Sequence, residues 1–108
     1  MFVALWEYEV KQGCEEQFEK AYGPGEDWAR LFRSDPHYLE TRLLRDAARD
    51  AVYLTLDFWN SRRAYVRFME TRAADYKTLD AASEDLTLRE RKVAWFEEVL
   101  PMKSNKAK

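Results

Sequence analysis

The stretch that decides the fold is YLTLDFWNSRRAYVRFME, residues 53–70, because its hydrophobic rhythm changes halfway. From Tyr53 to Trp59 the side chains alternate as in a strand. After Asn60 the apolar residues fall at the spacing of an amphipathic helix, on Ala64, Tyr65, Phe68 and Met69. Asn60 or Ser61 is expected to cap that helix, because a short side-chain oxygen can accept from its free N–H groups. A strand followed directly by a helix is therefore predicted here.

The strand at 52–59 has few plainly polar residues on either face. One face carries Leu54, Leu56 and Phe58, and the other carries Tyr53, Thr55, Asp57 and Trp59. A solvated face of an antiparallel sheet should instead alternate to polar side chains. Both faces therefore need something packed against them, and one of them could border a binding site.

With this strand and this helix included, the chain is expected to form four strands and four helical segments. Strands are expected at 2–10, 38–45, 52–59 and about 88–98. The helical segments lie at 13–22, about 26–33, 61–71 and around Leu79, with breaks at Gly-Pro-Gly (23–25) and Ser-Asp-Pro (34–36). The order strand, two helical pieces, two strands, two helical pieces, strand is that of a ferredoxin-like α+β fold. We expect a four-stranded antiparallel sheet with helices on one face, forming a single domain over residues 1–100, and a basic tail at 101–108.

The uncovered face of such a sheet predicts an oligomer. Leu54, Leu56 and Phe58 would form an exposed apolar patch in a monomer, and Val3 and Leu5 extend it. A second copy of the chain, packed sheet against sheet, covers this patch most simply. A homodimer is therefore predicted.

Composition excludes several classes of function. Eighteen basic against twenty acidic residues give a net charge of −2, and three of the lysines lie in the last six residues, which argues against a nucleic-acid groove. No apolar run is long enough to span a membrane. Cys14 is the single cysteine and His37 the single histidine, so neither a disulfide nor a zinc motif is expected. The lone cysteine and the absence of a signal-like N-terminus favour a cytoplasmic protein.

Three segments together resemble the antibiotic biosynthesis monooxygenase superfamily of dimeric α/β barrels. They are the opening EYEVKQGCEEQF, the central FWNSRRAYVRF and the closing LTLRERKVAWFEEV, and the resemblance covers about residues 1–100. It implies that Trp59 lies beside a pocket between helices and sheet, with Tyr53, Thr55, Asp57 and Trp6 near it. It also implies that Leu54, Leu56 and Phe58 face the partner subunit.

The resemblance suggests a chemistry as well. Polyketide-oxidising members carry a Tyr six residues after the strand-end Trp, which is Tyr65 here, and an Asn four residues before it, where this chain has Thr55. Their reaction uses no metal or flavin, since a deprotonated phenolic substrate reacts with dioxygen directly. Haem-degrading members need a first-strand Asn, where this chain has Trp6, and a helix His, which is missing after residue 37. No cofactor is therefore expected.

Each candidate site residue also has a plainer interpretation. Trp59 either lines the pocket or closes the core, and Thr55 could equally be an ordinary strand residue. Tyr65 lies on the apolar stripe of its helix, so a core role is favoured for it. Asp57 is either exposed at the sheet end, paired with Arg62 or Arg63, or a base with a raised pKa, and pairing is favoured. His37 is a proton shuttle at the pocket mouth or a solvent-facing turn residue.

Two functions follow from these alternatives. The first is a small cofactor-independent monooxygenase that binds an aromatic or quinone-like metabolite. The second is a non-catalytic dimeric barrel that binds a small apolar ligand or serves as a structural subunit. A solvent-open pocket of roughly 300 Å³ lined by Trp59 and Tyr65 would favour the first. A space filled by Trp6, Tyr8 and Trp28 would favour the second.

Overall fold

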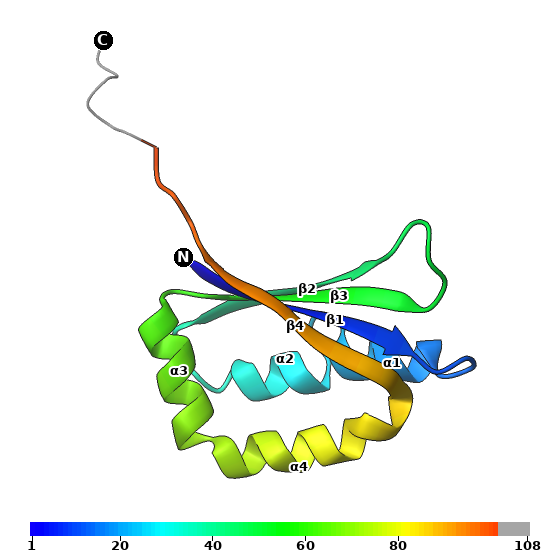
Figure 1. Cartoon of the computed structure of the whole chain (residues 1–108). Coiled ribbons are helices and arrows are strands. Elements are labelled where there is room, and N and C mark those ends of the chain that lie inside the picture. Colours follow the sequence, from blue (N-terminus) through cyan, green and yellow to red (C-terminus); the bar gives the residue numbers. More distant parts are fainter. Residues whose placement is uncertain (102–108) are drawn as a thin grey trace.

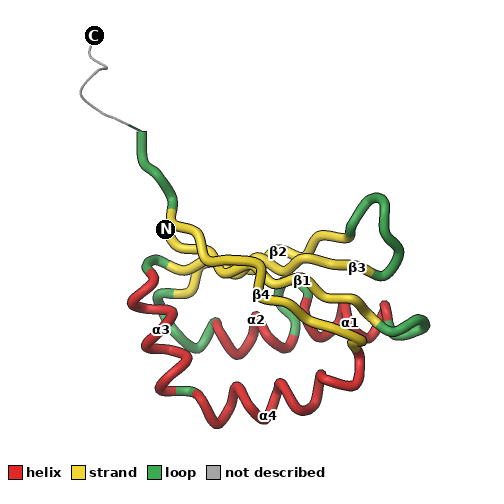
Figure 2. The backbone as a smooth tube through the Cα atoms, in the orientation of Figure 1, coloured by secondary structure: helices red, strands yellow, loops and turns green. Residues whose placement is uncertain are grey.

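A four-stranded antiparallel sheet forms one layer of the protein, and all the helices lie on one of its faces (Figures 1 and 2). The structure is a computed structural model and describes residues 1–101. The strands are β1 (Phe2–Val10), β2 (Tyr38–Arg45), β3 (Val52–Trp59) and β4 (Thr87–Glu97). The helices are α1 (Glu15–Tyr22), α2 (Asp27–Phe32), α3 (Arg62–Thr71) and α4 (Ala73–Ser83), with a 3₁₀ turn η1 (Glu84–Leu86) before β4. The strand order β2-β3-β1-β4 confirms the ferredoxin-like α+β fold that the sequence predicts.

Local chemistry explains where the central helices start and stop. The Ser61 side chain accepts a hydrogen bond from the backbone N–H of Ala64 at 3.1 Å, so α3 begins with the predicted cap. At the end of α1, Gly23 leaves no room for a side chain, because a Cβ there would lie 2.7 Å from the carbonyl oxygen of Glu19. Both signals are local, and for that reason they could be predicted from the sequence.

The core is built mainly from aromatic rings between the sheet and the helices. β1 and β3 turn alternate side chains toward the helices, and on β3 these are Tyr53, Thr55, Asp57 and Trp59. The largest fully buried side chains are Trp59, Phe2, Phe18, Phe68 and Val10. The other face of β3 carries the half-buried Leu54, Leu56 and Phe58, so the strand divides its residues as expected.

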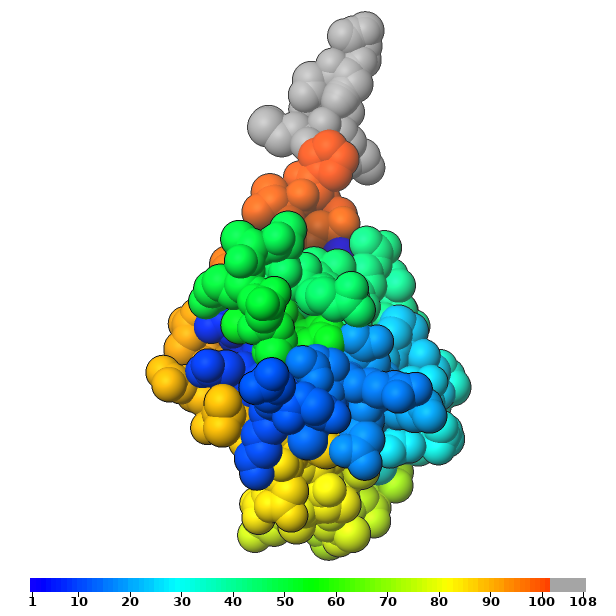
Figure 3. Space-filling model, turned by 90° about the vertical axis from the view of Figure 1, so that its right-hand side faces the viewer, coloured from blue at the N-terminus to red at the C-terminus, as the bar shows by residue number. Residues whose placement is uncertain are grey.

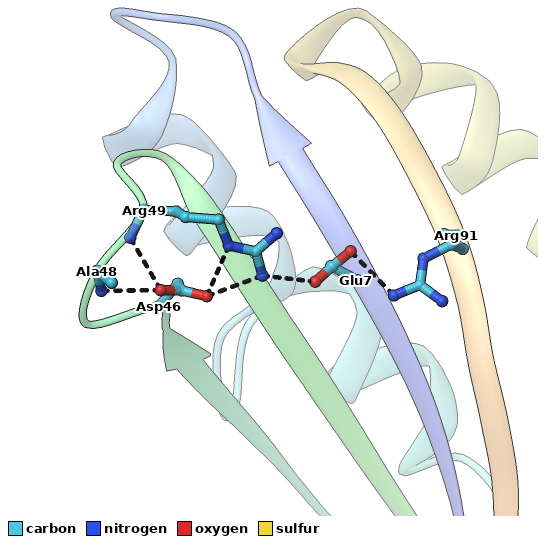
Figure 4. A network of polar contacts seen from close by, with 5 residues as sticks. All are labelled: Glu7, Asp46, Ala48, Arg49 and Arg91. Atoms are coloured by element: carbon cyan, nitrogen blue, oxygen red, sulfur yellow. Dashed lines mark hydrogen bonds and ion pairs between the residues drawn. The ribbon is translucent and has the colours of Figure 1, made fainter.

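A charged network fixes the β2–β3 turn to the uncovered face of the sheet (Figure 4). Asp46 accepts hydrogen bonds from the backbone N–H groups of Ala48 and Arg49, each at 2.8 Å. The Arg49 guanidinium bridges Asp46 and Glu7 of β1, and Arg91 of β4 binds the other oxygen of Glu7 at 3.1 Å. The β2–β3 turn is thus joined to β1 and β4 beside the apolar patch.

The chain leaves the sheet after β4. In Figures 1 and 3 the segment that follows β4 projects away from the body of the molecule. Val99 in this segment is 91% exposed. Of the basic tail predicted at 101–108, residues 102–108 lie outside the described residues.

Candidate functional site

A small cavity lies between the sheet and the helices. Its walls are formed by Trp6, Tyr8, Tyr22, Trp28, Phe32, Thr55, Asp57, Tyr65, Tyr76, Asp80 and Glu90. Its volume is about 20 Å³. That volume holds about one water molecule, far below the several hundred Å³ of a typical ligand pocket. The conformation described here is therefore closed to any aromatic metabolite.

Asp57 is the most unusual residue on the cavity wall. Its side chain is only 9% exposed, in the middle of β3. Burial raises its pKa to about 7, against the opposing effect of a hydrogen bond from Thr41. The favoured expectation of a salt bridge to Arg62 or Arg63 is wrong, because Asp57 makes no ion pair with any of residues 1–101. The raised pKa of a buried carboxyl is the alternative that the structure supports.

A chain of hydroxyl groups positions this carboxyl. Thr41 lies opposite Asp57 in the sheet and donates its single hydroxyl proton to Oδ1 at 2.7 Å. The Tyr38 hydroxyl lies 2.7 Å from the same Thr41 oxygen, so it must be the donor in that second hydrogen bond. Tyr38 is half-buried, and the chain therefore runs from Asp57 toward the surface at β2.

The remaining polar groups on the cavity wall are mainly hydrogen-bond donors. Burial raises the pKa values of Tyr8 and Tyr65 well above the usual range of a phenol, so both hydroxyls stay protonated at neutral pH. Burial also raises the pKa of Tyr76 to about 12. Thr55 is 3% exposed, and its hydroxyl has no partner at normal hydrogen-bond geometry among residues 1–101, although it lies close enough to the Tyr8 hydroxyl to lower the pKa of that tyrosine slightly. The indole N–H of Trp28 likewise has no partner at normal hydrogen-bond geometry in this range, although it lies near the Tyr22 hydroxyl. Such unpaired buried groups are what a bound oxygen or nitrogen atom would satisfy.

Trp59 takes the plainer of its two expected places. It is 0% exposed and is not part of the cavity wall. Four rings pack against it with centroid distances of 5.1–5.6 Å, those of Phe32, Tyr38, Tyr65 and Phe68. Of the four expected pocket residues, the structure brings Thr55, Tyr65 and Trp6 to the cavity and places Trp59 behind it.

His37 lies apart from the cavity. It occupies the turn before β2, where its exposed ring approaches Asp35 with an Nδ1–Oδ1 distance of 3.0 Å. It does not line the cavity, and its hydrogen bond to Asp35 joins it to none of the other candidates.

Sequence reasoning missed the partners of Asp57 and the outer end of the cavity. Thr41 could have been found, because the register in which Arg45 pairs with Tyr53 also places Thr41 opposite Asp57. Asp80 follows Tyr76 by one helical turn on α4, which is the spacing of side chains on one face. Glu90 pairs with Tyr8 across β4 and β1. No local signal links Asp80 to Glu90, because only packing of α4 against the sheet brings them to one cavity.

The described residues give no support to a metal site or to a membrane-spanning helix. Residues 1–101 contain no group of three or more His, Cys, Asp or Glu side chains that could hold a metal ion. Within the same range, no helix has the length and apolarity that a membrane crossing requires.

The fold and this cavity define the class of protein as a ferredoxin-like α+β domain with an aromatic site between its two layers. The sequence profile of the antibiotic biosynthesis monooxygenases matches residues 1–75. The chain therefore belongs to the antibiotic biosynthesis monooxygenase family. Members of this family are typically homodimers. No functionally curated protein matches the sequence.

Solved structures of this family share the fold. A Nitrosomonas europaea protein assigned to the antibiotic biosynthesis monooxygenases is 18% identical, with a TM-score of 0.71 over 93% of this chain and 100% of that one. SnoaB, a cofactor-independent oxygenase from Streptomyces nogalater, is 17% identical, with a TM-score of 0.71 over 94% and 96%. A Deinococcus radiodurans protein with the same assignment is 11% identical, with a TM-score of 0.73 over 94% and 96%. At such identities these likenesses establish the fold and not the reaction.

Proposed function

We propose that the protein is a cofactor-independent oxygenase that binds a flat phenolic substrate of the anthrone or hydroquinone type in the cavity beside Asp57. The observation that carries this proposal is the carboxyl of Asp57, which is buried on the cavity wall and has a pKa of about 7. A general base works best when its pKa lies near the operating pH. SnoaB, which shares the fold, is described as a cofactor-independent oxygenase.

In this proposal Asp57 removes the proton that starts the reaction. Thr41 occupies Oδ1, so Oδ2 is the oxygen left for the substrate. The proton can then leave through the hydroxyls of Thr41 and Tyr38, which lie in series between Asp57 and the surface. The resting hydrogen bonds run inward, from Tyr38 to Thr41 and from Thr41 to Asp57, so the protonated carboxyl and both hydroxyls must first turn until each donates toward the surface. Transfer of one proton along each of these bonds, with the last proton passing from Tyr38 to water, then restores the resting direction.

The oxygen chemistry then belongs to the substrate. The carbanion of an anthrone gives one electron to dioxygen, and the two radicals combine into a carbon–oxygen bond. Protonation yields a hydroperoxide, and loss of water converts it into a ketone, so a methylene group and dioxygen become a carbonyl group and water. The protein contributes donors that stabilise the phenolate or enolate oxygen. Tyr65, Tyr8 and Thr55 stand on the cavity wall for that role.

The site must open before such a substrate enters, since its volume is about 20 Å³. α4 is the element best suited to move, because Ser83 is its single buried residue. Its Tyr76 and Asp80 form one side of the cavity. Movement of α4 away from the sheet would enlarge the cavity without disturbing the buried core around Trp59.

We also propose that the active form is a homodimer built through the uncovered face of the sheet. Leu54, Leu56 and Phe58 are half-buried in one chain alone, and Phe96 on the neighbouring part of the sheet is 51% exposed. A second copy would remove this patch from water.

One observation favours the second candidate function, a dimeric barrel without catalysis. Trp6, Tyr8 and Trp28 leave a cavity of only about 20 Å³ between the layers, and Trp59 is sealed in the core. A structural subunit would need no larger opening, whereas binding of a small apolar ligand would also require the cavity to enlarge.

Dioxygen consumption separates the two functions. An oxygen electrode should record uptake with dithranol, an anthrone, or with a panel of hydroquinones, in the absence of added metal or flavin. Asp57→Asn should abolish the uptake because the base is lost. Tyr65→Phe should slow turnover by about a hundredfold if its hydroxyl stabilises the oxyanion. Gln17→Glu, on the exposed side of α1, is the control, and it should leave both the dioxygen uptake and the turnover rate unchanged. No uptake with any of these substrates would leave the non-catalytic function ahead.

A further inference from the structure

The outer end of the cavity carries negative charge and no positive charge. The half-buried Asp80 and the exposed Glu90 mark this end, whereas the third carboxyl of the lining, Asp57, is buried farther in. The whole lining includes no Lys, Arg or His. Neither Asp80 nor Glu90 makes an ion pair with another described residue. Burial raises the pKa of Glu90, and the nearby charges of Asp80 and Glu84 raise it further. Two carboxyls therefore repel each other at the place where a ligand would enter.

Aromatic rings form the wall next to these carboxyls. Trp28 stacks on Tyr22 at a centroid distance of 5.8 Å and meets Tyr76 edge-on at 4.9 Å. Tyr76 stands one helical turn before Asp80, so α4 presents a ring and a carboxyl to the same space. Faces of such rings attract cations, and they attract them most strongly where water is excluded.

Two buried hydrogen-bond donors on the cavity wall are available to a ligand. The hydroxyl of Thr55 and the indole N–H of Trp28 both border the cavity, and neither has a partner at normal hydrogen-bond geometry among residues 1–101. Both side chains are at least 95% buried. A ligand oxygen at the inner end could accept from these groups, while the outer end is suited to a different atom.

We propose that the substrate carries a protonated amine, which lies between Asp80 and Glu90 against the rings of Tyr22, Trp28 and Tyr76. The inference rests on the proposed site and adds a charge requirement to its phenolic substrate. The phenolic oxygen lies at the inner end, beside Asp57 and Thr55, and the ammonium group neutralises the two outer carboxyls. An anionic analogue is rejected by the same two charges.

A matched set of ligands tests the charge requirement without depending on turnover. Tyramine is a phenol with an ethylammonium chain, para-propylphenol is its neutral analogue, and para-hydroxyphenylpropionate is the anionic one. Calorimetric titration of the full chain at neutral pH should show tyramine binding roughly tenfold more tightly than para-propylphenol, the effect expected of one or two partly exposed charge contacts. The anion should bind more weakly than either.

Two double variants identify the carboxyls responsible. Asp80→Asn with Glu90→Gln should reduce the preference for tyramine to within about threefold. Glu70→Gln with Glu97→Gln changes the net charge equally at exposed positions outside the cavity, and should leave the preference intact. Equal affinities for the three ligands, no binding of any, or a preference that survives in the first double variant would each overturn the inference.

Oxygen uptake distinguishes this inference from the proposed function. A charge preference without dioxygen uptake, either from dithranol or from a hydroquinone that carries an aminoethyl chain, would preserve the amine site and refute the oxygenase. Uptake from dithranol without any charge preference would refute the amine site and preserve the oxygenase.

Discussion

The substitution Asp57→Asn should make the protein more stable at high pH, and the size of the effect follows from burial. The folded protein holds the proton of Asp57 up to a pKa of about 7, whereas an ordinary aspartate releases it near 3.8. The folded state therefore binds more protons than the unfolded state between these values, so the free energy of unfolding falls as the pH rises through this window. Three pH units at about 1.4 kcal/mol each amount to about 4 kcal/mol.

Asparagine escapes this cost because it cannot ionise, and its side-chain oxygen can still accept the hydrogen bond from Thr41. Near pH 4 the variant and the wild-type protein should have similar unfolding free energies, because Asp57 is then neutral in the fold. Near pH 8 the variant should be more stable by about 4 kcal/mol. The variant should therefore gain stability and lose activity, because the missing base is also the group that destabilises the fold.

Urea denaturation followed by tryptophan fluorescence, at one protein concentration from about pH 4 to about pH 8, measures this difference. The lowered pKa values of Glu7, Glu19 and Asp46 and the raised pKa of Glu90 also make stability depend on pH. These contributions cancel when the variant is compared with the wild-type protein. Glu70→Gln, an exposed change on α3, should give no such divergence. A difference between Asp57→Asn and wild type that stays constant over the whole range would refute the raised pKa and the role assigned to Asp57.

Three further predictions concern the surroundings of the site. Thr41→Val should raise the pKa of Asp57 above about 7, because the hydrogen bond that lowers this pKa is lost. Thr41→Ser keeps the hydroxyl and should leave the pKa unchanged. Carbon NMR titration of the Asp57 carboxyl measures the pKa in both variants. Trp59→Ala should destabilise the fold by about 3–5 kcal/mol in urea denaturation, since a fully buried ring leaves a cavity, and a smaller loss would contradict its place in the core. Leu56→Glu should convert the dimer to monomers in light scattering, while Gln17→Glu, with the same change in charge, should not; a wild-type protein that is already monomeric at micromolar concentration would contradict the interface.

The sequence by itself determined the elements and their order. Ser61, the Gly-Pro-Gly stop and the alternation along residues 52–59 are local signals, and each gives the structure that elementary physical chemistry predicts. The division of β3 into an aromatic-polar face and an aliphatic face could also be predicted, because side chains alternate across a strand with a period of two.

Only the tertiary structure decided which of these residues share a site. The sequence left Trp59 open between pocket and core and favoured a core role for Tyr65, yet packing against Phe32 and Phe68 seals Trp59 in the core, while Tyr65 reaches the cavity. The charge state of Asp57 depends in the same way on surroundings that lie far away in sequence. Burial by the helices removes its water, the neighbouring arginines do not pair with it, and Thr41 from another strand supplies its hydrogen bond. A pKa is set by solvation and by contacts in space, and neither can be derived from the order of residues along one strand.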